Sequence, residues 1–347
     1  IMTKRFLGNI MTDAPTAPTG PFQDGAASGV WSLAEALSYT KGGLWPIAGN
    51  SAPRALFAGG MVSSNVGDTI DQVVISTLGN ATDFGNLTEA KAISGGAGSN
   101  TRGLIAGGTN ADNFGSYTNV IEYVTFTSAG NGTDFGDLNN SVSCTGSSNS
   151  TRALFSGGGD VDNNNTNVID YVTINSAGNA TDFGDLTIAV RQHGGFASAT
   201  RSIVGGGYDG SSDTNIIQYT TIASVGNASD FGDLLSTGTY NHAGCSSPTR
   251  GLFSGGQGDT TRIQYVTIAS TGNATDFSNL SRTYEYTAST SSHVRGLVAT
   301  NGYSGDHVTE INYMGIHNGG NGADFGDLTL ARGWAVGLSN AHGGIAA

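Results

Sequence analysis

Aromatic and acidic side chains occur together in several short polar segments of this chain. The set consists of Phe114, Tyr117, Tyr208, Tyr303 and His307 with the carboxylates Asp160, Asp162 and Asp209. Aromatic faces can stack on sugar rings, and neighbouring carboxylates can accept hydrogen bonds from sugar hydroxyls. These residues are therefore candidates for carbohydrate binding. Solvated loops without a ligand have the same composition, and both interpretations stay open.

The residues give less support to catalysis or metal binding. Asp-Phe-Gly, the metal-binding tripeptide of kinases, recurs at 83–85, 134–136, 182–184, 230–232 and 324–326, and a tripeptide repeated in this way indicates scaffold. The six histidines are scattered, and neither His nor Cys pairs have zinc-ligand spacing. Residues 160–165 resemble half of a Ca²⁺ loop but lack its Gly and its bidentate Glu. We therefore expect no enzyme activity, no cofactor and no metal.

Composition narrows the choice of partners. The 347 residues carry a formal charge of −13 and only three lysines, which argues against nucleic acid, because phosphate binding needs clustered Lys and Arg. No run of 18 apolar residues occurs, so we expect no membrane insertion. Cys144 and Cys245 lie in small-residue segments, where we expect buried free thiols rather than a disulfide.

The elements that must position these residues come from a repeat of about 50 residues. Each copy begins with an Arg and an apolar run that usually ends in paired glycines, and it later carries a Phe in an Asn-x-[Ser/Thr/Ala]-Asp-Phe motif. The copies begin at Arg54, Arg102, Arg152, Arg201, Arg250 and Arg295, and their Phe residues are Phe84, Phe135, Phe183, Phe231, Phe277 and Phe325. Short β-type runs at this period predict an all-β propeller.

One copy shows the four strands expected in each blade. The Arg152 strand precedes a β-branched strand at 168–174, a short strand at 181–186 and a small-residue segment at 191–198. We place the small-residue strand innermost, where strands converge, and the Asp-Phe-Gly strand outermost. The repeated Arg could pair with the Asp before each Phe. The Gly-Asn turns are better explained by turn chemistry than as glycan acceptors.

Six complete copies and one surplus segment predict a closed ring. The C-terminal strand at 333–340 is expected to complete the first blade, so the propeller covers residues 51–347. Seven blades are the alternative, because residues 30–36 weakly resemble the Phe84 region.

Loop lengths divide the predicted ring into two unequal faces. From each Phe to the next Arg the spacing is 17 to 19 residues, whereas from each Arg to its Phe it ranges from 27 to 33. Most of this variation follows the paired glycines, so the variable loops should gather on one face. A diversified face on a constant scaffold is typical of a binding platform.

The paired glycines and the later aromatic positions resemble the kelch repeat of β-propellers. Tyr123, Tyr171, Tyr219, Tyr265 and Tyr313 take the kelch Tyr position, and Phe stands where kelch repeats usually have Trp. The sequence Gly-Asn-Ala-Thr-Asp-Phe-Gly-Asp-Leu looks more like kelch-like repeats in virion proteins of marine bacteriophages, as do the segment 28–36 that precedes the repeats and Trp45-Pro46. This resemblance implies an extracellular virion protein of the tail-fibre or tail-tip type that recognises a host glycan or receptor. A purely structural virion decoration and a bacterial surface adhesin are the alternatives.

Residues 1–50 differ from the repeats. They contain most of the prolines, a linker at 12–29 and a short predicted helix at 32–41. Their apolar residues without a blade are Trp31, Leu33, Leu37 and Trp45. We expect this arm to contact other virion proteins or neighbouring subunits of a homo-oligomer such as a trimer.

Overall fold

The structure is a computed structural model that describes residues 52–236, 240–257, 261–300 and 307–345, together with Ser32, Ala34, Glu35 and Ser38. The chain forms two compact units, Ile1–Ala52 and Pro53–Ala347. In the first unit Ala34, Glu35 and Ser38 are helical. Ser32 and Glu35 form a reciprocal capping box, in which the Glu35 amide donates to Ser32 Oγ (3.2 Å) and the Ser32 amide donates to Glu35 Oε2 (2.9 Å). The predicted anchors Trp31, Leu33, Leu37 and Trp45 lie outside the described residues.

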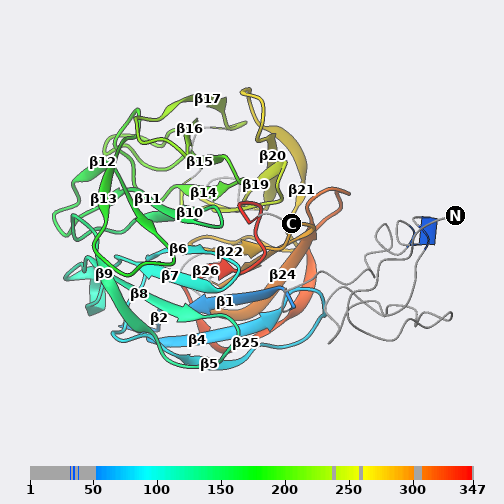
Figure 1. The fold of residues 1–347 in the computed structure, drawn as a ribbon, viewed down its shortest axis with the longest axis horizontal. Coiled ribbons are helices and arrows are strands. Elements are labelled where there is room, and N and C mark those ends of the chain that lie inside the picture. The colour runs from blue at the N-terminus through cyan, green and yellow to red at the C-terminus, as the bar shows by residue number, and fades with distance from the viewer. Residues whose placement is uncertain are drawn as a thin grey trace, which may run out of the picture. The chain divides into compact units, whose positions relative to one another are not determined.

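The second unit is a six-bladed β-propeller, as the repeat predicted, and the alternative of seven blades is wrong (Figure 1). Each blade is a four-stranded antiparallel sheet. From the axis outward, the first three blades are β26 (Val336–Ser339), β1 (Arg54–Ala58), β4 (Thr69–Val74), β5 (Thr82–Asn86); β6 (Gly95–Gly98), β7 (Arg102–Ala106), β8 (Val120–Thr125), β9 (Thr133–Asp137); and β10 (Thr145–Ser148), β11 (Arg152–Gly159), β12 (Asn165–Thr173), β13 (Thr181–Asp185).

The remaining three blades have the same order. They are β14 (Gly194–Ala197), β15 (Arg201–Gly205), β16 (Ile216–Thr221), β17 (Ser229–Asp233); β18 (Ala243–Ser246), β19 (Arg250–Ser254), β20 (Arg262–Thr267), β21 (Thr275–Asn279); and β22 (Ala288–Ser291), β23 (Arg295–Ala299), β24 (Val308–Gly315), β25 (Ala323–Arg332). The first blade also carries a small hairpin, β2 (Met61–Val62) with β3 (Asn65–Val66), and a 3₁₀ turn, η1 (Asp112–Phe114), extends a loop of the second. The trailing strand β26 pairs with β1 and closes the ring.

The innermost strands carry small residues because they approach one another closely. A Cβ atom at Gly146 would lie 2.4 Å from the Gly96 carbonyl oxygen, and one at Gly337 would lie 2.3 Å from the Ser289 carbonyl oxygen. Both distances are shorter than any normal contact, so only glycine fits at these positions. The prediction that slim residues surround the axis is confirmed.

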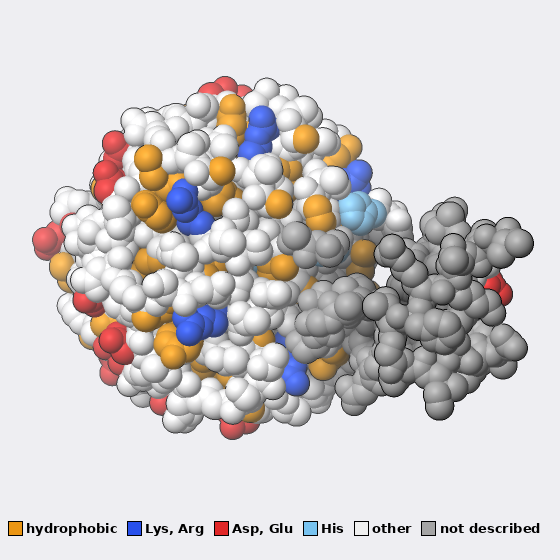
Figure 2. Space-filling model, viewed as in Figure 1, with side chains coloured by type: hydrophobic (Ala, Val, Ile, Leu, Met, Phe, Trp, Pro, Cys, Tyr) orange, Lys and Arg blue, Asp and Glu red, His pale blue; other side chains and the backbone are white. Residues whose placement is uncertain are grey.

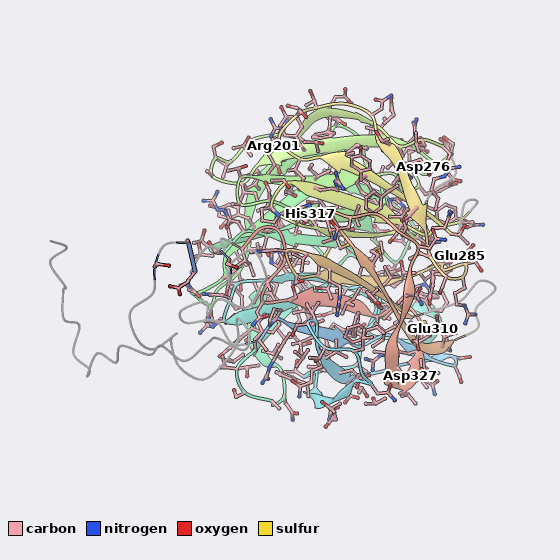
Figure 3. The ribbon with its side chains drawn as sticks, turned by 90° about the vertical axis from the view of Figure 1, so that its right-hand side faces the viewer. Arg201, Asp276, Glu285, Glu310, His317 and Asp327 are labelled. Carbon is pink, nitrogen blue, oxygen red and sulfur yellow. The ribbon has the colours of Figure 1, made fainter. Side chains whose placement is uncertain are left out.

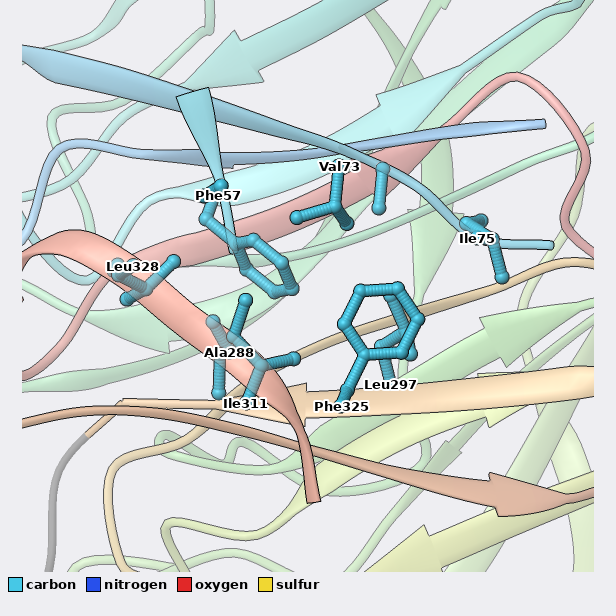
Figure 4. Close-up of a cluster of buried hydrophobic side chains, with 12 residues drawn as sticks. Phe57, Val73, Ile75, Ala288, Leu297, Ile311, Phe325 and Leu328 are labelled. Atoms are coloured by element: carbon cyan, nitrogen blue, oxygen red, sulfur yellow. The ribbon is translucent and has the colours of Figure 1, made fainter. Parts of the chain in front are cut away.

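Apolar side chains fill the space between neighbouring blades. Figure 4 shows the cluster between the first and the last blade, where Phe57 and Val73 face Leu297, Ile311 and Phe325. All five are 5% exposed or less. Burying one such side chain contributes about 1.5–3 kcal/mol, so blades stabilise each other mainly through these contacts.

A buried polar side chain in each third strand clamps the preceding blade. Gln218 Oε1 accepts a hydrogen bond from the Thr187 amide (2.6 Å), and Gln264 Oε1 accepts one from the Leu235 amide (2.9 Å). The equivalent acceptors are Asp71, Glu122, Asp170 and Asn312. Five of these amides follow the outer strand of the blade before, and the sixth, that of Thr329, lies within β25. Each clamp satisfies its amide donor and joins the two blades.

The suggested ion pair between the repeated Arg and the Asp before each Phe is wrong. The Arg201 guanidinium stacks over the Tyr219 ring at 4.5 Å and donates to the Ile268 carbonyl of the next blade (2.9 Å). Arg102, Arg152, Arg250 and Arg295 repeat both contacts. In the first blade Arg54 donates instead to Gln72, which replaces the Tyr, and to the Phe126 carbonyl. The Tyr strand lies between the Arg strand and the outer strand, and the guanidinium is held over the Tyr ring rather than beside the Asp. In two blades the guanidinium also approaches the Phe ring of the outer strand.

The Gly-Asn turns and the Asp-Phe-Gly motifs interlock between blades. Asn131 Oδ1 accepts from the Asn86 amide of the preceding outer strand (3.1 Å), and the other five copies make the same bond. The glycine of each Asp-Phe-Gly meets the next turn, since a Cβ atom at Gly85 would lie 2.4 Å from the Gly130 carbonyl oxygen. Both motifs therefore have a structural role.

Candidate functional site at the axial opening of the loop face

Antiparallel blades place their connections at two ends. The loops between second and third strands share one end with the crossings from each outer strand to the next inner strand. We call this end the loop face and the opposite end the turn face. Arg201, which begins a second strand, and Glu285, in a crossing, lie toward opposite sides of the propeller in Figure 3. Figure 2 views the turn face, where the Arg side chains are spaced around the ring beside hydrophobic groups.

Three of the predicted aromatic residues lie on the loop face as partly buried side chains. Phe114 packs edge-on against Trp334 with ring centroids 5.8 Å apart. Tyr208 lies under the Arg191 guanidinium, 5.1 Å from its ring centre, and contacts Tyr240 at 6.3 Å. Burial raises the pKa of Tyr117, and the charge of Arg191 acts in the opposite direction. Arg191 therefore stacks on Tyr208 and lies near enough to Tyr117, from another blade, to affect its pKa.

The predicted carboxylates have a different immediate role. Asp160 Oδ1 accepts hydrogen bonds from the backbone amides of Asp162 (2.9 Å) and Asn164 (2.8 Å). Asp209 accepts from the backbone amides of Ser212 and Ser211, and these bonds lower its pKa to about 2. Both carboxylates hold the shape of their own loops. Asp162 is exposed.

Of the predicted residues Tyr303 and His307, only His307 is described. His307 Nδ1 accepts a hydrogen bond from the Ser63 amide (3.1 Å), and its ring lies 6.0 Å from that of Trp334. It therefore connects the sixth blade to the first. Tyr303 lies outside the described residues.

The sequence interpretation missed three aromatic residues that come from the crossings. Trp334 packs on Tyr286 with ring centroids 4.5 Å apart and ring planes tilted by 38°. The Tyr240 ring lies 6.3 Å from that of Tyr208, and Tyr240 is near enough to Tyr286 to affect its pKa. The sequence does contain one feature that points to two of them, Trp334 and Tyr286. The crossings have nearly constant length, but the residue two positions before each inner strand differs in every copy.

We call these loop-face side chains the aromatic belt, and Trp334 and Tyr286 among them line the axial cavity. The belt consists of Phe114, Trp334, Tyr286, Tyr240, Tyr208 and Tyr117. Burial raises the pKa of Tyr117, Tyr240 and Tyr286, so their hydroxyls stay protonated at neutral pH and can donate hydrogen bonds. Burial also raises the pKa of Glu285, which lies beside Tyr240 and Tyr286. The belt combines half-buried aromatic faces with neutral hydroxyl groups.

Trp334 and Tyr286 of the belt lie at the opening of a cavity of about 180 Å³ on the propeller axis. The six innermost strands form its wall, and its loop-face end is lined by Tyr286, Trp334, Gln192 and Asn241. The wall is mostly backbone and small side chains, so it offers hydrogen-bonding groups and apolar surface in similar measure.

Among the described residues, no group of three or more His, Cys, Asp or Glu side chains could hold a metal ion. Cys144 and Cys245 are free thiols, and burial raises the pKa of both to about 12. No helix in the described part of the chain is long and apolar enough to cross a membrane.

Comparison with known proteins yielded neither a matching family model nor a matching curated protein.

Proposed function

We propose that this protein is a non-enzymatic virion appendage protein whose loop face binds a glycan on the host cell surface. The aromatic belt is the observation that carries the proposal. Its rings come from several blades, two of them line the axial opening, and all are partly buried. Sugar rings present C–H faces that stack on such aromatics and hydroxyls that pair with their phenol groups.

The proposed role in a virion rests on the amino-acid sequence of the repeat, which resembles kelch-like repeats of phage virion proteins. Attachment to other virion proteins and assembly into a homo-oligomer are assigned to residues 1–50. Deleting residues 1–43 should leave a folded propeller that no longer assembles. Normal assembly of the truncated protein would contradict this assignment.

The binding part is tested on an array of bacterial surface polysaccharides and on intact bacterial cells. Wild-type protein should bind a subset of the array, and Trp334→Ala and Tyr208→Ala should each reduce that binding about tenfold or more. Val294→Ala is the matched control, because Val294 is 66% exposed in a turn of the opposite face. Absence of binding to every polysaccharide and cell type would favour a purely structural virion protein.

A further inference from the structure

The axial cavity is closed at the turn face by the segment 341–345. His342 Nε2 lies 2.9 Å from the Gly98 carbonyl oxygen and 3.2 Å from Ser148 Oγ. The Gly343 amide donates to the Ser246 carbonyl (3.0 Å), and His293 Nε2 lies 2.9 Å from the Ile345 carbonyl. Gly98, Ser148 and Ser246 are the last residues of β6, β10 and β18. The segment therefore forms a floor, and a ligand of the cavity must approach from the loop face.

Six equivalent residues surround the opening at the other end of the same strands. We call them the mouth ring: Ile93, Ser143, Gln192, Asn241, Tyr286 and Trp334. All except Ser143 have left-handed backbone conformations, with φ between 54° and 61°. Side chains other than Gly and Asn pay about 1–2 kcal/mol for this conformation, and a β-branched Ile there is a marked outlier. Glycine would adopt it without strain.

The mouth ring joins neighbouring blades through its backbone, since the Asn241 amide donates to the Gln192 carbonyl (2.8 Å) and the Tyr286 amide donates to the Asn241 carbonyl (3.1 Å). Side chains that hold the blades together are the same or similar in every copy, as the repeated Arg and the turn Asn are. The mouth ring instead holds six different residue types in six copies. The backbone bonds account for the left-handed conformation but need no particular side chain. Varied side chains at positions where glycine would fit without strain therefore favour a role in ligand contact.

The chemistry around the cavity selects the kind of ligand. The mouth ring supplies a stacked Tyr286–Trp334 pair and the amides of Gln192 and Asn241. No Lys, Arg, Asp or Glu is among the described residues that line the cavity. A ligand that inserts here meets aromatic faces and neutral hydrogen-bonding groups, which suits an uncharged sugar better than an acidic one.

We infer that the cavity holds the terminal, uncharged sugar of a glycan end-on, and that the mouth ring determines which sugar is accepted. This inference rests on the proposed glycan binding. The outer belt residues Tyr117 and Tyr208 then contact the following sugars of the chain.

The test begins with the polysaccharide that binds wild-type protein best on the array. Its binding is competed with the monosaccharides found in it, with their methyl glycosides, and with uronic and sialic acids. One neutral monosaccharide or its methyl glycoside should compete, and the acidic sugars should not. Gln192→Gly and Asn241→Gly should each weaken binding about tenfold or more without lowering Tm, because glycine suits the left-handed backbone.

A second pair of variants separates this inference from glycan binding itself. Ser289→Phe places a bulky side chain in the wall of the cavity and should abolish competition by the monosaccharide, with folding checked by circular dichroism and Tm. Tyr208→Ala should weaken binding of the polysaccharide but not of the free monosaccharide. If Tyr208→Ala abolishes binding while Gln192→Gly, Asn241→Gly and Ser289→Phe leave it unchanged, the loop face binds glycans and the axial site is wrong. Competition by acidic sugars alone, or no binding to any polysaccharide, would also overturn it.

Discussion

Arg332, the last residue of β25, donates a hydrogen bond to Asp71 in β4, with Nη2 and Oδ2 3.1 Å apart and both side chains buried. Since β25 belongs to the sixth blade and β4 to the first, the pair joins the two ends of the ring. Arg332 also donates to the Phe57 carbonyl (2.8 Å), and Asp71 accepts from the Thr329 amide (3.1 Å). At two other blade boundaries the neutral amides Gln218 and Gln264 clamp the preceding blade.

Removing one member of this pair should destabilise the propeller strongly. Asp71→Ala leaves the buried Arg332 guanidinium without its counter-charge, which costs about 3–5 kcal/mol. Urea denaturation followed by tryptophan fluorescence measures the change. Asp83→Ala in the neighbouring strand is the control, because Asp83 is exposed, and it should change stability by less than about 0.5 kcal/mol. Equal losses in both variants would contradict the role assigned to the pair.

Two glycines of the second blade should respond differently to alanine. Gly136 has φ 146°, and a Cβ atom there would lie 2.4 Å from the Gly178 carbonyl oxygen. Gly136→Ala should therefore cost about 2–4 kcal/mol through strain and displaced backbone. Gly130 lies in a turn with no atom within 4 Å of an added Cβ, so Gly130→Ala should be neutral or slightly stabilising. Thermal unfolding of the two variants measures this difference, and equal Tm values would contradict the prediction.

The repeat allowed the blade number, the strand order and the slim inner strands to be predicted, because each depends on spacing and residue size within one copy. Contacts between copies were harder to predict. The Arg-to-Asp pairing failed because the sequence shows which residues share a blade but not that Tyr219 lies between Arg201 and the outer strand.

The aromatic belt was only half predicted for a related reason. Phe114, Tyr117 and Tyr208 lie in loops of variable length, which drew attention to them. Tyr240, Tyr286 and Trp334 lie in crossings whose length hardly changes between copies. Loop length therefore does not distinguish these crossings from purely structural connections. The kink that turns residues such as Trp334 toward the opening depends on a left-handed backbone, which no residue type at that position reveals.

The contribution of the stacked arginines to stability should depend on the planar shape of the guanidinium as well as on its charge. Arg201→Ala removes both the Tyr219 contact and the hydrogen bond to the Ile268 carbonyl, and it should cost about 1–2 kcal/mol. Arg201→Lys keeps the charge but loses the flat guanidinium, so it should recover only part of that loss. Arg282→Ala, a partly exposed arginine near Glu310, is the comparison and should have little effect. Full recovery with Lys would show that charge alone matters.

Acid should weaken the propeller at the floor of the axial cavity. Burial lowers the pKa of His342 to about 4, and the nearby His293 adds charge repulsion in the same direction. In the unfolded chain this histidine binds a proton near its ordinary pKa of 6.5, so the unfolded state holds more protons between pH 6.5 and 4. The free energy of unfolding should therefore fall as the pH drops through this window, by up to about 3 kcal/mol from His342.

His342→Gln tests the source of this acid sensitivity, because an amide can hydrogen-bond at the same place without titrating. The variant should show a shallower loss of stability between pH 6.5 and 4 in urea titrations. His193, whose pKa burial lowers to about 3, contributes a similar dependence from the loop-face end, so some slope should remain. His317→Gln is the matched control, since His317 is exposed on the turn face, and its pH profile should follow that of the wild type. An unchanged slope in His342→Gln would show that the floor of the cavity is not the acid-sensitive element.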